Sequence, residues 1–381
     1  MKLADFHYEL PPERIAQEPW EPRDHSRLLV VYSATQTLRH RRFFEIEQSL
    51  RSGDALVLNA TKVFPARLRG KKKTGGKVEL LLLERGADPA VWRSLVRGAT
   101  SETDLEFPEG LTGRMERRLA EGEWDVRFSG GDVRTWLDRH GEMPLPPYIK
   151  RPEPRANDLH RYQTVYAEHE GAVAAPTAGF HFTPELLDRL RVKGVHIVYV
   201  TLHVGWGTFR PVRTETIEAH RMLAERYVVD AATARELNAV RANSGRIIAV
   251  GTTAVRTLES VVDDAGLFRA GEGETSLYIY PGYPFKAIDG LVTNFHLPDS
   301  TPLLLANAFY GDKRQHGSPL TTCGDDVGGA RASSPADNPQ SSSPRKRGST
   351  LTSPFALRFA YDAAIHEGYR FYSYGDAMLI L

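Results

Sequence analysis

A block of short strand-like segments interrupts a chain that otherwise alternates between helices and strands. Apolar or alternating runs at residues 78–83, 91–96 and 124–129 are separated by glycines and charged side chains. Helical periodicity is nearly absent from the block until residues 133–139. Because short alternating runs broken by turn residues are typical of closed or packed sheets, the block predicts a small β-barrel or sandwich.

The block has a marked boundary at its C-terminal side. Residues 144–154, PLPPYIKRPEP, are rich in proline, which fixes φ and disfavours helix in the preceding residue. We therefore expect an extended connector and a domain boundary there. The predicted fold class is α/β, with a discontinuous three-layer core domain at residues 1–64 and 151–381 and an inserted β-barrel domain at residues 65–150.

The two parts of the predicted core share one pattern, in which apolar runs alternate with segments of helical periodicity. Alternation of this kind predicts a mainly parallel sheet covered by helices. We expect strands at residues 28–32, 55–59, 195–202 and 246–250, and helices at residues 43–50, 184–193, 232–242 and 253–263.

Residues 312–354 differ from the rest of the core in composition. This segment is dense in Ser, Pro and Gly and nearly lacks large apolar side chains. Such a segment cannot bury enough apolar surface to offset the entropy of ordering, so we predict a disordered insertion.

Charge and cysteine content exclude few functions. The chain has 49 basic and 48 acidic residues, so binding of a polyanion requires a local patch. Cys323 is the single cysteine, which excludes an intrachain disulfide and a cysteine-based zinc site. No N-terminal apolar region and no run of about eighteen apolar residues is present, so we expect a cytoplasmic protein without a membrane span.

Four clusters of Gly, Thr, Asn and His directly follow predicted strands, where open α/β sheets place their ligand crevices. Thr183 can cap the helix that follows it, and the Arg256 guanidinium suits a carboxylate or phosphate. The alternative for each cluster is an ordinary capped turn or a buried histidine that only satisfies backbone groups. The clusters span residues 176–184, 201–209, 250–256 and 293–298.

Basic side chains gather at the start of the β-rich block. They could contact the phosphates of a nucleic acid, although a charged hairpin is equally often a solvated face. No His-x-x-x-His pair or cysteine cluster accompanies the histidines, so we expect no metal site. The candidate tRNA-binding residues are Arg67, Arg69, Lys71, Lys72 and Lys73.

Taken in order, these motifs resemble the S-adenosylmethionine:tRNA ribosyltransferase-isomerase family over nearly the whole chain. The resemblance implies an α/β core interrupted by a β-barrel, which agrees with the change in composition. The matching stretches are IAQEPWEPRDHSRLLV, LVLNATKVFPARLRGKK, GEMPLPPYIKR, YQTVYAEHEGAVAAPTAGFHFT, TLHVGWGTFRPV, IIAVGTTAVRTLES, TNFHLPDSTPLLLANAFYG and EGYRFYSYGDAMLI.

The resemblance also implies a reaction. The ribosyl group of S-adenosylmethionine is joined to 7-aminomethyl-7-deazaguanine at the wobble position of tRNA, giving epoxyqueuosine with release of adenine and methionine. S-adenosylmethionine is a consumed substrate, so no separate cofactor is implied, and a monomer is the default. A base must remove the ribose C5′ proton and an acid must assist adenine departure, tasks that suit imidazoles. His181, His203 and His296 are the candidates, and the sequence does not rank them.

By the same resemblance, a set of polar and glycine residues is expected to bind substrate. Within this set, Arg256 is expected to hold the methionine carboxylate, and Phe295 to stack on adenine or on the target base. The expected residues are Asn59, Thr61, Thr177, Gly179, Gly205, Gly207, Thr208, Thr252, Thr253, Arg256, Asn294, Phe295 and Asp376.

Two positions depart from the family pattern. Ala60 stands where the family usually has aspartate, and Leu223 where it usually has histidine. The two departures motivate one alternative, a catalytically impaired tRNA-binding member of the family. A second alternative is a methyltransferase that uses the same sulfonium substrate, although no glycine-rich turn follows Tyr32, where such an enzyme would have one.

Overall fold

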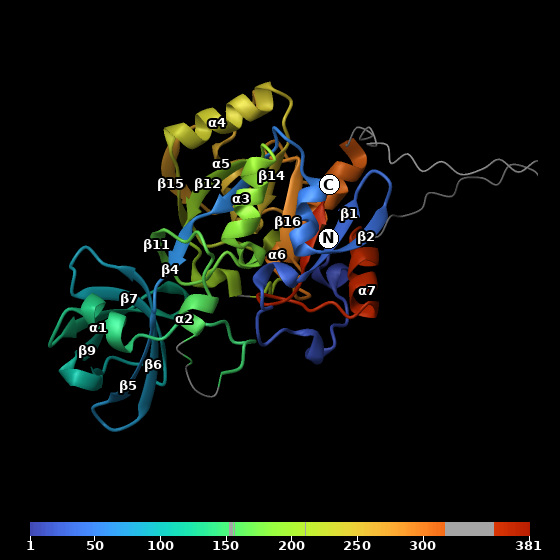
Figure 1. Ribbon diagram of the computed structural model, residues 1–381. Helices are drawn as coiled ribbons and strands as arrows, with labels where there is room; N and C mark the ends of the chain where they lie inside the picture. Colours follow the sequence, from blue (N-terminus) through green and yellow to red (C-terminus); the bar gives the residue numbers. More distant parts are fainter. Residues whose placement is uncertain (152–154, 156, 210, 317–353) are drawn as a thin grey trace, which may run out of the picture.

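A nine-stranded sheet and a closed six-stranded barrel form the architecture of the computed structural model, which describes residues 1–151, 155, 157–209, 211–316 and 354–381 (Figure 1). The predicted fold class is confirmed. In order across the sheet, the strands are β15 (Gly271–Thr275), β13 (Glu225–Val229), β12 (His196–Leu202), β3 (Ala55–Asn59), β14 (Ile247–Val250), β16 (Gly290–Asn294), β17 (Ala377–Ile380), β1 (Arg27–Tyr32) and β2 (Thr37–Arg42).

The sheet is mixed rather than mainly parallel. Strands β12, β3, β14 and β16 run parallel to one another at its centre, and β17 is parallel to β1. The remaining neighbours are antiparallel, including the β1–β2 and β13–β15 pairs at the two edges. The prediction of a parallel sheet is therefore correct for the centre and wrong for the edges.

The inner strands of the sheet, β1 among them, place alternate side chains in two separate apolar cores. On β1, Leu29 and Val31 join one apolar cluster, whereas Leu28 and Val30 join the other. A strand that is buried on both faces needs apolar residues at every position, which explains the continuous run LLVV. Helices cover both faces, which gives the three layers.

Of the helices that cover the sheet, the three predicted at residues 184–193, 232–242 and 253–263 begin and end within two residues of those bounds. On one face lie α4 (Ala231–Ala242), α5 (Thr252–Val261), α6 (Thr301–His316) and α7 (Arg358–His366). On the other face lies α3 (Pro184–Val192), whose N-cap Thr183 accepts a hydrogen bond from the Leu186 amide as predicted.

The predicted helix at residues 43–50 is instead the 3₁₀ helix η4 (Phe43–Ser49). Three residues per turn place Phe43 and Ile46 on the same side, and both are buried against the sheet. Tertiary packing therefore selects the tighter helix.

The barrel closes in the order β10-β7-β6-β5-β8-β9 and encloses its own apolar core. Inward-pointing positions alternate along β6, where Val78, Leu80 and Leu82 are buried. The division of the chain into domains stays a prediction. The barrel strands are β5 (Arg67–Lys72), β6 (Lys77–Arg85), β7 (Val91–Arg97), β8 (Asp104–Glu106), β9 (Thr112–Arg118) and β10 (Glu123–Ser129), followed by α1 (Val133–His140).

Short elements connect the barrel and the sheet. Strand β4 (Thr61–Val63) leaves the sheet toward the barrel and pairs in parallel with β11 (His169–Ala172). The other short elements are α2 (Asp158–Arg161), η1 (Leu3–Phe6), η2 (Pro12–Arg14), η3 (Arg23–His25), η5 (Pro108–Gly110), η6 (Ala120–Gly122), η7 (Thr177–His181), η8 (Trp206–Phe209) and η9 (Ile217–Ala219).

Helix α6 corrects part of the predicted insertion. Residues 312–316, expected to be disordered, continue this helix. Residues 317–353 lie outside the part of the chain that the structure describes. Within the described ranges, no helix is long and apolar enough to cross a bilayer.

Candidate active site

The four central strands end at one edge of the sheet. Strands β3, β12, β14 and β16 are mutually parallel, so their carboxyl ends point the same way. Three of the four predicted clusters follow β12, β14 and β16 directly. Such an edge is where open α/β sheets bind ligands.

Two adjoining cavities open at this edge. The smaller, of about 80 Å³, has room for a few water molecules only, since each takes about 30 Å³ of liquid. Six of the predicted site residues line it: Thr177, Thr208, Thr252, Thr253, Asn294 and His296.

The larger cavity, of about 700 Å³, lies between the sheet edge and the barrel. Its volume falls within the range of about 300–1,000 Å³ that is typical of small-molecule sites. Val204 and Thr208 line both cavities, so the two adjoin. Predicted residues in the larger cavity are His203, Gly205, Gly207 and Thr208.

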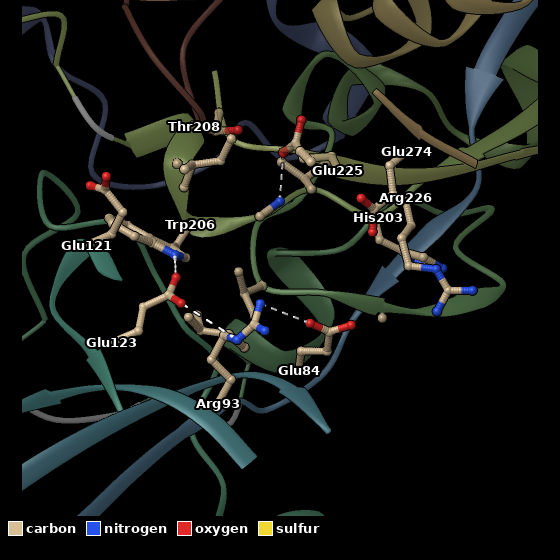
Figure 2. A pocket seen from close by; sticks show the side chains of 18 of the residues that line it. Glu84, Arg93, Glu121, Glu123, His203, Trp206, Thr208, Glu225, Arg226 and Glu274 are labelled. Atoms are coloured by element: carbon tan, nitrogen blue, oxygen red, sulfur yellow. Dashed lines mark hydrogen bonds and ion pairs between the residues drawn. The ribbon is translucent and has the colours of Figure 1, made fainter. Parts of the chain in front are cut away.

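The barrel contributes a row of paired charged side chains to the larger cavity (Figure 2). Glu123 accepts a hydrogen bond from Trp206 Nε1 at 2.9 Å, and its other oxygen lies 3.7 Å from Arg93 Nε. Arg93 Nη1 in turn lies 3.2 Å from Glu84. These contacts join β6, β7 and β10 of the barrel to the loop that follows β12.

Sequence reasoning missed the barrel residues Glu84, Arg93 and Glu123. They lie in ordinary strands of alternating pattern, and no local signal marks them as part of a site. Leu223, one of the two departures from the family pattern, does line the larger cavity, whereas Ala60 is buried and lines neither cavity. An aliphatic group at residue 223 makes that side of the cavity apolar.

Arg256 is not placed to bind a substrate carboxylate. Its buried guanidinium forms an ion pair with Glu225 and donates to the carbonyls of Leu277 and Thr275, at 2.9 and 3.1 Å. Glu225 also accepts a hydrogen bond from the Gly205 amide at 2.7 Å. The prediction for Arg256 is corrected to a structural role, in which it fixes the carboxylate that holds the glycine loop.

His203 is the one candidate histidine that lines the larger cavity. Its Nδ1 lies 2.9 Å from the hydroxyl of Thr61. Partial burial lowers the pKa of His203, and the charges of Arg226 and His169 lower it further. The imidazole is therefore neutral at neutral pH and available as a base.

Of the other two candidate histidines, His181 is buried with both ring nitrogens engaged, whereas His296 is partly buried at the smaller cavity. His181 stacks on Phe43, and its two ring nitrogens contact Ser26 Oγ at 2.7 Å and Asn294 Nδ2 at 3.1 Å. His296 Nε2 lies 2.7 Å from Thr293 Oγ1 at the smaller cavity. Burial lowers the pKa of both imidazoles to about 3. The structure thus separates the three histidines rather than gathering them around one ligand.

Two further predicted residues lie in the core. Phe295 is fully buried and packs edge-on against Tyr361 and Tyr369, so it cannot stack on a nucleobase. Asp376 is buried and accepts hydrogen bonds from Trp20 Nε1 and from two backbone amides. Both predictions are corrected to structural roles.

Asn59 and Thr61 are also buried and line neither cavity. Asn59 connects the end of β3 to the Leu202 backbone. Its Nδ2 donates to the Leu202 carbonyl and its Oδ1 accepts from the Leu202 amide, both at 3.0 Å. The two residues therefore support the cavity from behind rather than bind substrate in it.

Gly179 is another packing residue rather than a cavity residue. A Cβ there would lie 2.0 Å from the Tyr166 hydroxyl and 2.8 Å from the Thr164 methyl. We expect Gly179→Ala to lower the free energy of unfolding by about 1–3 kcal/mol, measured by urea denaturation. Gly311→Ala in α6 is the control, because nothing lies within 4 Å of a Cβ there. Equal stability of the two variants would contradict this packing role.

The candidate tRNA-binding residues lie on and directly after β5 of the barrel. Arg67 and Arg69 are partly neutralised, by Glu79 at 3.7 Å and Glu142 at 3.0 Å. Lys71 and Lys73 are exposed. Their role in binding tRNA stays a prediction. In the ranges that the structure describes, no three His, Cys, Asp or Glu side chains come together as a metal site would require.

An α/β sheet and a closed barrel with a cavity of about 700 Å³ between them form the frame of the candidate site. A family model described as queuosine biosynthesis protein matches residues 3–317 and 348–380. The chain belongs to the family of S-adenosylmethionine:tRNA ribosyltransferase-isomerases.

Similar proteins cover the whole chain. Enzymes of that name from Trichlorobacter lovleyi and Moorella thermoacetica are 45% and 46% identical to it, over 100% of both chains in each case. A crystal structure of S-adenosylmethionine tRNA ribosyltransferase from Thermotoga maritima matches with a TM-score of 0.51 and 35% identity, covering 99% of this chain and 100% of that chain.

Proposed function

We propose that the chain transfers and isomerises the ribosyl group of S-adenosylmethionine onto 7-aminomethyl-7-deazaguanine at the tRNA wobble position, in the larger cavity. One observation carries the location: the cavity of about 700 Å³ joins the glycine loop after β12 to the barrel, and His203 lines it. Adenine and methionine leave as products, and epoxyqueuosine stays on the tRNA.

His203 is the proposed base. The positive sulfonium acidifies the neighbouring C5′–H of the ribose, and a neutral imidazole can take that proton. Carboxylates and guanidinium groups both line the cavity, and S-adenosylmethionine likewise carries a sulfonium, an ammonium and a carboxylate, so the lining offers partners for charges of both signs. Arg93 keeps two of these carboxylates in place.

The tRNA is proposed to approach from the barrel side. The exposed lysines of β5 and its turn would contact phosphates, and a base in an anticodon loop is already poorly stacked. Extruding that base into the cavity therefore costs little. We further propose a cytoplasmic monomer that needs no separate cofactor or metal.

Product analysis tests the function. The purified chain is incubated with S-adenosylmethionine and tRNA carrying 7-aminomethyl-7-deazaguanine, in buffer with EDTA and no added cofactor. We expect adenine and methionine in equal amounts, and one epoxyqueuosine per adenine, measured by liquid chromatography and mass spectrometry.

The rival functions give different products. S-adenosylhomocysteine would identify a methyltransferase, and retention of tRNA without product would identify a catalytically impaired binder. Either result would overturn the proposal. The control is the same tRNA with an unmodified guanine, which lacks the accepting amine and should release no adenine above background.

A further inference from the structure

The Nδ1 side of the His203 ring is in contact with protein atoms rather than with the cavity. Its Nδ1 lies 2.9 Å from Thr61 Oγ1, and Thr61 is fully buried and lines neither cavity. Thr61 therefore acts on His203 rather than on a ligand.

The two contacts of the Thr61 hydroxyl favour one of the two neutral tautomers of His203. The Thr61 hydroxyl has one proton, and its Oγ1 lies 3.4 Å from the His169 carbonyl oxygen. A carbonyl oxygen can only accept, so the arrangement that satisfies both contacts has the Thr61 hydroxyl donating to His169 and accepting from Nδ1 at 2.9 Å, which favours the tautomer protonated on Nδ1. In that tautomer Nε2 carries a free lone pair and can accept a proton.

Close packing holds the ring in this orientation. A Cβ on Gly171 would lie 2.7 Å from Nδ1 and 2.8 Å from Cε1 of His203, and the φ of Gly171 is +154°. Only glycine lets the backbone approach the ring so closely. Gly171 lies on β11, which pairs with the strand that carries Thr61, so both neighbours come from one two-stranded unit.

Asn59 fixes the distance between the backbones that carry Thr61 and His203. Its Oδ1 accepts hydrogen bonds from the backbone amides of Thr61 at 3.2 Å and Leu202 at 3.0 Å. Leu202 directly precedes His203 in the chain. The Asn59 side chain therefore holds the backbone beside the Thr61 hydroxyl and the backbone beside the His203 imidazole at a fixed separation.

We propose that Thr61 is a positioning residue, whose hydroxyl holds His203 in the tautomer protonated on Nδ1 and leaves Nε2 to accept the ribose C5′ proton. A bond forms between that proton and Nε2, the C5′–H bond breaks, and its electron pair stays on the carbon beside the sulfonium. The inference rests on the proposed function for the role of Nε2, but the tautomer itself does not depend on it.

Nitrogen-15 NMR of histidine-labelled protein reads the tautomer directly. We expect His203, assigned by the signal that is lost in His203→Gln, to show a protonated Nδ1 and an unprotonated Nε2. Thr61→Val removes the acceptor and should shift His203 toward the Nε2-protonated form, whereas Thr61→Ser should keep the wild-type pattern. A wild-type His203 protonated on Nε2, or an unchanged tautomer in Thr61→Val, would overturn the proposal.

Kinetics separate positioning from a purely structural role. Thr61→Val should lower kcat by about tenfold or more, a part of what a general base contributes, with little change in KM. Thr61→Ser should restore most of the rate, and melting curves confirm that both variants fold. A wild-type enzyme that shows the expected tautomer but forms no epoxyqueuosine would refute the proposed function alone, and a Thr61→Val variant with wild-type kcat would refute the positioning role alone.

Discussion

Replacing His203 with glutamine is expected to lower kcat by a factor of about 10²–10⁴, with little loss of stability. Glutamine fills similar space and can hydrogen-bond to Thr61, but it cannot take a proton from carbon. Its half-buried position at the cavity makes a large loss of folding energy unexpected. Release of adenine from S-adenosylmethionine in the presence of the modified tRNA is the measurement.

The pH dependence of kcat/KM provides a second readout for the same residue. Because burial lowers the pKa of His203 below its ordinary value of 6.5, the base form is lost only as pH falls below that value. The acid limb of the wild-type profile should therefore lie below pH 6.5, and it should disappear in His203→Gln.

His196 offers a matched control on the same strand. It lies at the opposite end of β12, exposed and 3.0 Å from Glu236. His196→Gln should keep the wild-type rate and the acid limb. Equal rates for the two variants would remove His203 from the mechanism.

Acidification is expected to destabilise the protein through His181, which is buried, and His296, which is partly buried. Each has a folded-state pKa of about 3 against about 6.5 when unfolded, so between these values the unfolded chain binds more protons. Stability is therefore fully present above pH 6.5 and falls toward pH 3. The slope approaches about 1.4 kcal/mol per pH unit for each histidine, or about 2.5 kcal/mol each between pH 6 and 4.

Urea denaturation at several pH values measures this slope. His181→Gln keeps groups that can bond to Ser26 and Asn294 but does not titrate, so its stability should fall by about 1.4 kcal/mol less per pH unit than that of the wild type. His366→Gln is the control, because the His366 side chain is 85% exposed and therefore hydrated in the folded as well as the unfolded protein. Parallel slopes for wild type and His181→Gln would show that the buried imidazole is not held neutral.

Much of the fold could be predicted because its signals are local. The run LLVV in β1, the cap at Thr183 and the alternation in β6 each follow from which faces a segment buries. The edge strands β2 and β15 are not among the predicted strands, because TLRHRR and GEGET carry few apolar side chains and give no clear strand pattern. The choice of a 3₁₀ helix at Phe43–Ser49 depended on the sheet beneath it.

The candidate site shows the same division. Motif reasoning found the loop after β12 and the small-cavity residues, because glycines, threonines and histidines after parallel strands meet at one edge. It misassigned Arg256 and Phe295, since a cation or an aromatic ring next to a glycine turn suits a ligand and a core equally well. It missed Glu123, because nothing in a barrel strand shows what that strand will face.

The amino-acid order by itself determined most of the central strands and of the helices beside them, the presence of a β-rich block, and which family the motifs resemble. Tertiary structure alone decided that His203 lines the larger cavity and His296 the smaller one while His181 is buried, and that barrel carboxylates line the candidate site. The physical reason is range: secondary structure and capping depend on neighbours within a few residues, whereas burial, ion pairing and the pKa of an imidazole depend on groups far away in the chain.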